Sequence, residues 1–271
     1  MTKYLKYFII SMFRNKNLIF FGLFFVLISL IPNISSAANI VSSTSDPYIR
    51  YLKVLNYVGR WYGLAILVSF SIVSSGLAQM IYFNSSAVVY LNRYSKLSVN
   101  RYYFESMLGA MAVFGIYAFV ILSATIVGYS HVLKENLFPV RLPMLVLFTM
   151  LAGLFYFSFS FSLQAIAISL KKVRLMDYLA YLPIALTFIL GYIQVNTSIN
   201  ISYLVYLSPL NSILGLLIYG YSRSSLFSVE YLLITSLLYI LLFQLLSIWS
   251  LKRLKEVRIC LLYTSPSPRD S

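Results

Sequence analysis

The sequence predicts an all-α, polytopic membrane protein with six transmembrane helices, and three observations support this fold class. Hydrophobic residues make up 60% of the 271 residues, charged residues make up only 10%, and the apolar residues gather in long runs between polar and basic stretches. A soluble globular chain carries about 25% charged residues, so the apolar surplus is expected to face lipid. At about 20 residues per span, the chain has room for six or seven spans and short loops.

The first 17 residues predict an amphipathic helix lying in the membrane interface. Apolar residues recur there with the period of a helix, and the bases lie largely on the other side. A first span follows over about 18–31 and is expected to continue past Pro32 into the weakly apolar stretch near Ala38. The Ser-, Asn- and Thr-rich residues 33–58 predict a loop marked by Asp46-Pro47. The apolar positions of the N-terminal helix are Leu5, Phe8, Ile9, Met12 and Phe13, and its bases are Lys3, Lys6, Arg14 and Lys16.

Five further spans follow, separated by polar segments. Residues 84–105 form a polar and basic connection after the second span, and the mixed stretch 195–229 precedes the last span. Within that stretch, residues 210–219 predict an apolar helix too short to cross a bilayer. The expected boundaries of spans two to six are 61–83, 106–129, 144–170, 178–193 and 231–251.

The distribution of bases predicts the orientation. Six spans place both termini on one side, and that side carries fourteen Lys and Arg residues against six on the other. By the positive-inside rule both termini are expected in the cytoplasm, and the protein is expected in the plasma membrane. The fourteen are Lys3, Lys6, Arg14, Lys16, Arg93, Lys96, Arg101, Lys171, Lys172, Arg174, Lys252, Arg253, Lys255 and Arg258, and the six are Arg50, Lys53, Arg60, Lys134, Arg141 and Arg223.

The predicted spans contain few ionisable or polar residues that could take part in ion coupling or line a transport path. Glu105, Asp177 and Glu230 are expected at span ends within reach of water, and no acid lies at the centre of a span, which disfavours proton-driven transport. Gln79, Gln164 and Gln244 are candidates for a polar path, although an interhelical hydrogen bond is the simpler interpretation of each.

Composition and motifs also disfavour an enzyme. The chain has one cysteine, Cys260, and one histidine, His131, which excludes internal disulfides, Cys/His zinc sites and Cys–His nucleophilic pairs. It contains no Gly-Lys-Ser/Thr phosphate loop, HExxH helix or GxSxG motif. We therefore expect no catalytic, cofactor-binding or metal-binding residues in this chain.

The connection after the second span is the most informative segment. It combines aromatic and basic residues in a stretch too polar for lipid, which predicts a short helix parallel to the membrane. Such a helix docks in a groove of a cytoplasmic partner, with aromatic anchors, or is held at the surface by anionic lipid. Spacing alone leaves both interpretations open. The residues concerned are Tyr90, Arg93, Tyr94, Lys96 and Leu97.

Over residues 1–258 the order of features resembles the type-2 ATP-binding-cassette permease family. The shared features are a basic amphipathic entry helix, six spans and a basic loop after the second span. The stretch Leu97-Ser98-Val99-Asn100-Arg101 then enters the third span, where the family often has a similar sequence. Leu207-Ser208-Pro209-Leu210 begins a helix that looks like the family's outer re-entrant element. The Glu-Arg pair and following Gly-Thr common in the family's loop are absent.

The resemblance implies a permease subunit, with export as the expected direction. Such subunits form homodimers or heterodimers with a similar permease in the lipid bilayer, and a separate cytoplasmic ATPase uses ATP to rock the two bundles. Arg101 joins the five loop residues as an expected ATPase contact. No nucleic-acid partner is implied. The alternatives are a non-transport membrane protein, such as an assembly or immunity factor, and then a membrane-embedded enzyme.

The C-terminal string is set apart from the fold. Residues 260–270 read CLLYTSPSPRD, an abrupt change to Pro and Ser that looks like a translated sequencing adaptor. We therefore expect one permease domain over 1–259 and an artefactual tail over 260–271.

Overall fold

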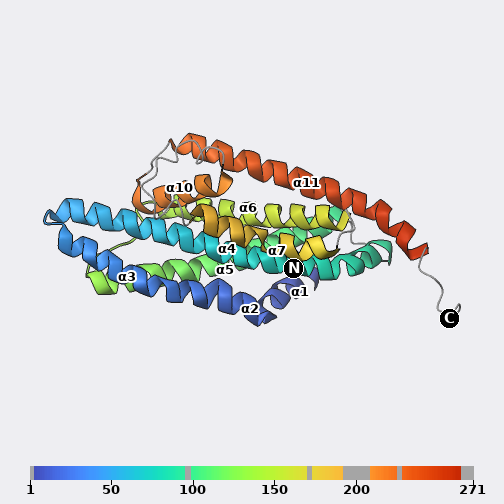
Figure 1. Cartoon of the computed structure of the whole chain (residues 1–271), viewed down its shortest axis with the longest axis horizontal. Coiled ribbons are helices and arrows are strands. Elements are labelled where there is room, and N and C mark those ends of the chain that lie inside the picture. The colour runs from blue at the N-terminus through green and yellow to red at the C-terminus, as the bar shows by residue number, and fades with distance from the viewer. Residues whose placement is uncertain (1–2, 95–98, 170–172, 192–207, 225–227, 264–271) are drawn as a thin grey trace.

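The computed structural model describes residues 3–94, 99–169, 173–191, 208–224 and 228–263, and every regular element in these ranges is helical. The side chains of 81–99, 168–177, 191 and 251–263 fall outside this description. The long helices run side by side along the longest axis of the molecule (Figure 1). They are α3 (Phe25–Ser43), α4 (Pro47–Tyr94), α5 (Val99–Leu133), α6 (Leu142–Ser169) and α11 (Val229–Tyr263).

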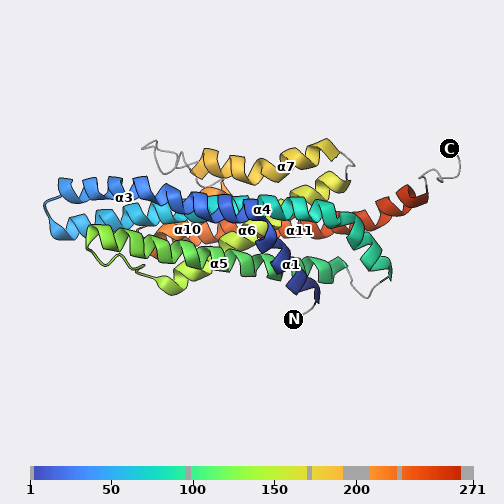
Figure 2. The ribbon, with the colours of Figure 1, turned by 90° about the horizontal axis from the view of Figure 1, so that it is seen from below.

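Shorter helices complete the bundle. The N-terminal α1 (Lys3–Arg14) leads through α2 (Lys16–Ile19) and the π-helix η1 (Phe20–Phe24) into α3. In Figure 2, α1 crosses α5 on one side of the bundle while α7 lies on the opposite side. The remaining described elements are α7 (Val173–Leu186), the π-helix η2 (Thr187–Gly191) and α10 (Pro209–Ser222).

Five described helical stretches are long and apolar enough to cross a membrane, which is the architecture of a multi-pass membrane protein. The predicted fifth span corresponds to a shorter apolar stretch, Tyr178–Leu190, that falls below the length of the others. The described part of the chain therefore supports five full-length spans, and the sixth stays a prediction. The five stretches are Lys16–Ser43, Pro47–Met80, Asn100–Leu133, Leu142–Ala167 and Val229–Ser250.

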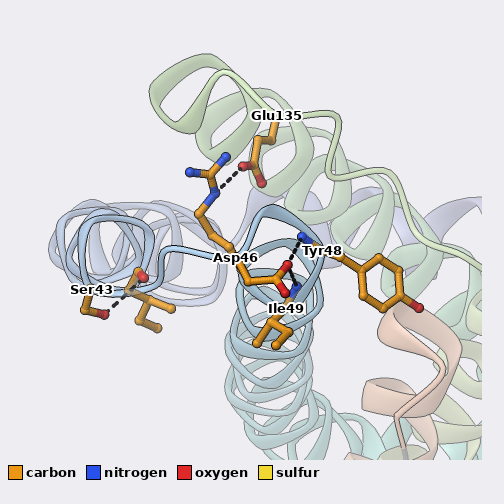
Figure 3. Close-up of polar contacts among 7 residues, drawn as sticks. Ser43, Asp46, Tyr48, Ile49 and Glu135 are labelled. Carbon is orange, nitrogen blue, oxygen red and sulfur yellow. Dashed lines mark hydrogen bonds and ion pairs between the residues drawn. The ribbon is translucent and has the colours of Figure 1, made fainter.

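The loop predicted between the first two spans is much shorter than residues 33–58, although it lies at the predicted Asp46-Pro47 mark. α3 runs to Ser43 and α4 begins at Pro47, so only three residues connect the two helices. The polar side chains are compatible with a helix because several bond to carbonyls one turn earlier: the Asn33 amide donates to the Ser29 carbonyl at 2.6 Å. Asp46 caps α4, since its carboxylate accepts from the backbone N–H groups of Tyr48 at 2.9 Å and Ile49 at 3.3 Å (Figure 3).

The connection after the second span is helical at its start, because the backbone of α4 continues to Tyr94, beyond the apolar stretch Pro47–Met80. This end of α4 bends away from the bundle (Figure 2), and it contains Tyr90, Arg93 and Tyr94; its orientation to the membrane and its role stay predictions. Lys96 and Leu97 lie outside the described residues. At the other end of the chain, α11 continues to Tyr263, four residues into the segment predicted to be a tail.

The helix α4 lies at the centre of the bundle and packs against α3, α5, α6, α7 and α10. The faces of α3, α5 and α11 that point away from the bundle carry large apolar side chains, as expected of helices that contact lipid. The most exposed of these are Phe20, Phe24, Ile28 and Ile31 before and within α3, Phe119 and Val127 on α5, and Ile234, Leu238, Leu241 and Leu245 on α11.

The short helix α10 lies inside the bundle, between α4, α6 and α11. It packs closely on two neighbours: a Cβ atom at its Gly220 would lie 2.9 Å from Leu145 Cα of α6, and a Cβ atom at Gly63 of α4 would lie 2.6 Å from Cδ1 of its Leu214. A helix therefore covers the residues predicted to form the short apolar helix, and most of its residues are buried within the bundle; its re-entrant character stays a prediction. The residues that lead into it, 192–207, are outside the described ranges.

Candidate functional site: a polar lane between three helices

Two rows of polar side chains face the space between α4, α6 and α7. On α6, Tyr156, Ser160 and Gln164 follow one another at four-residue spacing, which places them on one face of the helix. On α4, Ser71, Ser75 and Gln79 have the same spacing. We call these six residues, together with Tyr181 on α7 and Thr187 on η2, the polar lane.

Hydrogen bonds to the α7–η2 segment hold both ends of the polar lane. At one end, Gln79 Nε2 donates to Tyr181 Oη at 3.3 Å. At the other end, Tyr156 Oη lies 2.6 Å from Thr187 Oγ1, which itself donates to the Pro183 carbonyl at 2.7 Å. The Tyr156 hydroxyl is therefore the donor to Thr187. These bonds show that the row on α4 and the row on α6 both face the continuous α7–η2 segment.

The interior of the polar lane is buried and uncharged. Ser71, Ser75, Tyr156, Ser160, Gln164 and Thr187 are all buried. None of the residues that define the lane is an acid or a base. The lane therefore offers hydroxyl and amide groups for hydrogen bonding, but no carboxylate for proton or cation coupling.

The three glutamines predicted to line a path are distributed unevenly. Gln79 and Gln164 lie in the polar lane, whereas Gln244 is half-buried on α11, which does not border it. Sequence reasoning missed the other six residues of the lane: Ser71, Ser75, Tyr156, Ser160, Tyr181 and Thr187. The repeated four-residue spacing of polar residues within apolar helices was the available signal for the two rows on α4 and α6. No local signal placed Thr187 beside Tyr156, because that contact joins residues 31 positions apart.

A second candidate site is the contact between α1 and α5. The Tyr4 hydroxyl lies 3.0 Å from Ser106 Oγ, and its ring packs on Tyr102 with centroids 5.4 Å apart. Phe8 is only 1% exposed and lies against Gly109. Burial raises the pKa of Tyr4 above its ordinary value, so its hydroxyl stays protonated and able to donate.

The opposite face of α1 remains available at the surface. Lys6, Tyr7, Ile10 and Arg14 are exposed, and Tyr7 retains 62% of its accessible surface. The predicted amphipathic helix is therefore present over Lys3–Arg14. Its apolar face packs against protein, and its basic face points outward.

Glu105 is buried, contrary to its prediction, and it pairs with Arg101, a predicted ATPase contact. It was expected at a span end within reach of water, but it is only 7% exposed. Arg101, one turn earlier on α5, contacts it with Nε and Oε1 2.8 Å apart. This pairing compensates the buried carboxylate. The guanidinium of Arg101, a predicted ATPase contact, is thus already engaged within the chain.

The opposite end of the bundle is tied together by the connection between α5 and α6. Arg50 at the start of α4 pairs with Glu135 at 3.2 Å (Figure 3). The Arg141 guanidinium bonds the Tyr219 hydroxyl and lies over its ring, 4.7 Å from the centroid. Tyr221 Oη donates to the Leu137 carbonyl at 2.9 Å. These contacts hold the connection against α4 and the last turn of α10.

Comparison with known proteins provides no relative: no family model, no curated protein and no solved structure matches this chain.

Proposed function

We propose that this chain is the membrane-spanning permease subunit of an ATP-binding-cassette exporter, driven by a separate cytoplasmic ATPase. In this proposal α7 and η2 form a short sixth span, α10 is the outer re-entrant helix, both termini are cytoplasmic, and two such subunits form the transporter in the plasma membrane. The chain itself contributes no ATP site. The closest alternative is a membrane protein that only packs against partners.

The observation that carries the proposal is the docking of α1 on the first turns of α5. Tyr4 and Phe8 contact Tyr102, Ser106 and Gly109, which lie within eleven residues of the start of α5 at Val99. The connection from α4 leads directly into these turns. The exposed basic face of α1 and the aromatic-basic end of α4 therefore belong to the same end of the bundle. A cytoplasmic partner binding there would engage two helices that continue into the membrane.

The polar lane supports a role in moving a substrate through the membrane rather than in coupling to an ion gradient. It places hydrogen-bonding groups inside an otherwise apolar bundle, and it includes no ionisable acid that a proton gradient could act on. Movement of a substrate along the lane against its concentration gradient would then have to draw its energy from a partner. This fits a separate ATPase that changes how the helices pack.

The test is recovery of an ATPase encoded next to this gene, co-expressed with the chain and purified through a tag on the chain. Tyr90→Ala combined with Tyr94→Ala is expected to lower recovery at least tenfold, because anchor residues at a hot spot contribute about 2 kcal/mol or more each. The matched control is Tyr48→Ala combined with Tyr231→Ala, two exposed tyrosines at the far ends of α4 and α11.

Chain-dependent ATP hydrolysis is measured on the same samples, at equal membrane abundance of the chain. We expect the control pair to match the wild type in both readouts. Unchanged recovery and unchanged hydrolysis for the Tyr90/Tyr94 pair would reject this coupling mechanism. Absence of any co-purifying ATPase would favour the non-transport alternative.

A further inference from the structure

We propose that the bend between α1 and α2 binds the headgroup of an anionic phospholipid, whose acyl chain lies along the outer surface of η1 and α3. Arg14 and Lys16 supply positive charge for the phosphate, and Phe21, Phe24 and Ile28 supply apolar surface for the chain. The inference rests on the multi-pass membrane architecture and not on the proposed ATPase.

The bend at Asn15 brings two bases to one point of the surface. The Asn15 backbone is extended, with φ −77° and ψ 97°, and its side chain accepts from the Asn17 N–H at 3.2 Å. Arg14 ends α1 and Lys16 begins α2, and both are exposed. Their Cα atoms are no more than about 7.6 Å apart, because two trans peptides of about 3.8 Å each separate them. One phosphate group can therefore accept hydrogen bonds from the guanidinium and from the ammonium group.

Contacts with α4 place this bend where the apolar part of the bundle ends. Before the bend, Ser11 Oγ donates to Met80 Sδ at 3.5 Å, and Met80 is the last residue of the apolar stretch Pro47–Met80. After the bend, Leu18 is buried against Gly76, one turn further inside the same stretch. The helix α1 crosses the bundle obliquely before it reaches this point (Figure 2). The two bases are therefore expected at the level of the lipid headgroups.

An apolar surface begins directly after the two bases. Phe21, Phe24, Ile28 and Ile31 recur at spacings of three or four residues, and each is between 49% and 64% exposed. Phe21 follows Lys16 by five residues, which corresponds to about 7 Å of helix rise. The headgroup layer adds about 5–8 Å to each side of the hydrocarbon core. A phospholipid can therefore contact the bases and the apolar surface at once, whereas a soluble anion can contact only the bases.

The charge near the bend favours an anionic lipid over a zwitterionic one. Glu105, the acid beside the contact between α1 and α5, is buried and pairs with Arg101, so it does not neutralise the exposed bases. Each Lys or Arg beside an anionic membrane surface adds electrostatic attraction. A zwitterionic headgroup carries its own cation, which cancels much of this attraction.

The experiment uses the purified full chain in phosphatidylcholine nanodiscs without any ATPase. The probe is phosphatidylglycerol with a photoreactive diazirine on one acyl chain, and labelled peptides are identified by mass spectrometry. Labelling of residues 16–31 is expected to be saturable. The matching phosphatidylcholine probe is expected to label these residues at least tenfold less. Soluble glycerol phosphate, which has the anionic group without acyl chains, is expected not to compete.

Arg14→Gln combined with Lys16→Gln is expected to lower labelling of residues 16–31 at least fivefold. The matched control is Lys53→Gln combined with Lys134→Gln, which removes two exposed bases toward the other end of the bundle. The control is expected to label as the wild type does. The thermal unfolding midpoint is expected to be the same for both pairs, because all four side chains lie at the surface.

Equal labelling by the two probes, competition by glycerol phosphate, unchanged labelling in the Arg14/Lys16 pair or an equal loss in the control pair would overturn the proposal. An Arg14/Lys16 pair that labels normally but no longer recovers a co-expressed ATPase would also overturn it, and would assign the bases to a protein contact. The expected labelling in a chain that recovers no ATPase would retain the lipid site and reject only the transport role.

Discussion

Single glycines decide how closely α10 approaches the rest of the bundle. At Gly220 the nearest atoms to an added Cβ belong to the backbone of Leu145, with Cα at 2.9 Å and N at 3.1 Å. A backbone cannot rotate out of the way as a flexible side chain does, so the two helices would have to separate. The same region carries the hydrogen bond from the Arg141 N–H to the Gly220 carbonyl at 3.2 Å.

We predict that Gly220→Ala destabilises the protein by about 1–3 kcal/mol, because overpacking of a fitted contact costs this much. Gly115→Ala is the control: its Cβ would meet only Met150 Cε, at 3.4 Å, so stability is expected to stay unchanged or to rise by up to about 1 kcal/mol through helix propensity. The thermal unfolding midpoint in detergent measures both. Equal midpoints for the two variants would contradict the close packing of α10 on α6.

At the scale of the element, α1 combines two kinds of surface on one short helix. Phe8 and Met12 are buried against the bundle, while Lys6, Tyr7 and Arg14 stay exposed. The three exposed residues are two bases and one tyrosine, and such side chains suit contact with a membrane surface or with a partner protein. The stability of this helix therefore depends on tertiary contacts, as expected for a helix of only 12 residues.

We predict that Phe8→Ala releases α1 from α5. Truncating a buried Phe costs about 3–5 kcal/mol, and at Phe8 the loss falls on the contact with Gly109, whose added Cβ would lie only 2.5 Å from the Phe8 ring. Hydrogen exchange over residues 3–14 is expected to accelerate at least tenfold. Tyr7→Ala, on the exposed face, is expected to exchange at the wild-type rate. Equal protection in the two variants would show that lipid, rather than α5, holds the helix.

At the scale of the whole molecule, the arrangement of helices and the distribution of bases point to one orientation. The α3–α4 connection lies at the end of the bundle opposite to the C-terminal part of α11 (Figure 1). Fourteen bases belong to the predicted cytoplasmic side and six to the other. The connection at Thr44–Asp46, together with the Arg50–Glu135 pair, is therefore expected outside the cell.

We predict that single cysteines, introduced after Cys260→Ser, react with an impermeant maleimide in intact cells according to this orientation. Ser43→Cys is expected to label and Asn15→Cys is expected to be shielded, since both positions are exposed on the protein. The same contrast is expected for Ser198→Cys, labelled, and Lys172→Cys, shielded. Permeabilised cells provide the control in which all four react. Labelling of Asn15→Cys from outside would overturn the orientation.

Much of the fold was predictable because membrane helices depend on local composition. The apolar runs and the polar stretches between them predicted the helices that became α3, α5, α6 and α11, and the 3.6-residue pattern predicted α1. Even the short α10 could be located from Pro209 and the apolar residues that follow it. Helix ends were harder, because side chains such as Asn33 bond to their own helix and let a polar segment remain helical.

By itself, the sequence determined the membrane class, the helical content and the charge asymmetry, since these follow from residue type and spacing along one chain. Only the tertiary structure decided that Glu105 is buried beside Arg101, that Gln244 lies away from the polar lane, and that Tyr156 meets Thr187. The physical reason is that burial and hydrogen-bond partners depend on the rotation and register of each helix against its neighbours. Packing between residues far apart in the sequence sets that register, so it cannot be read from the periodicity within one helix.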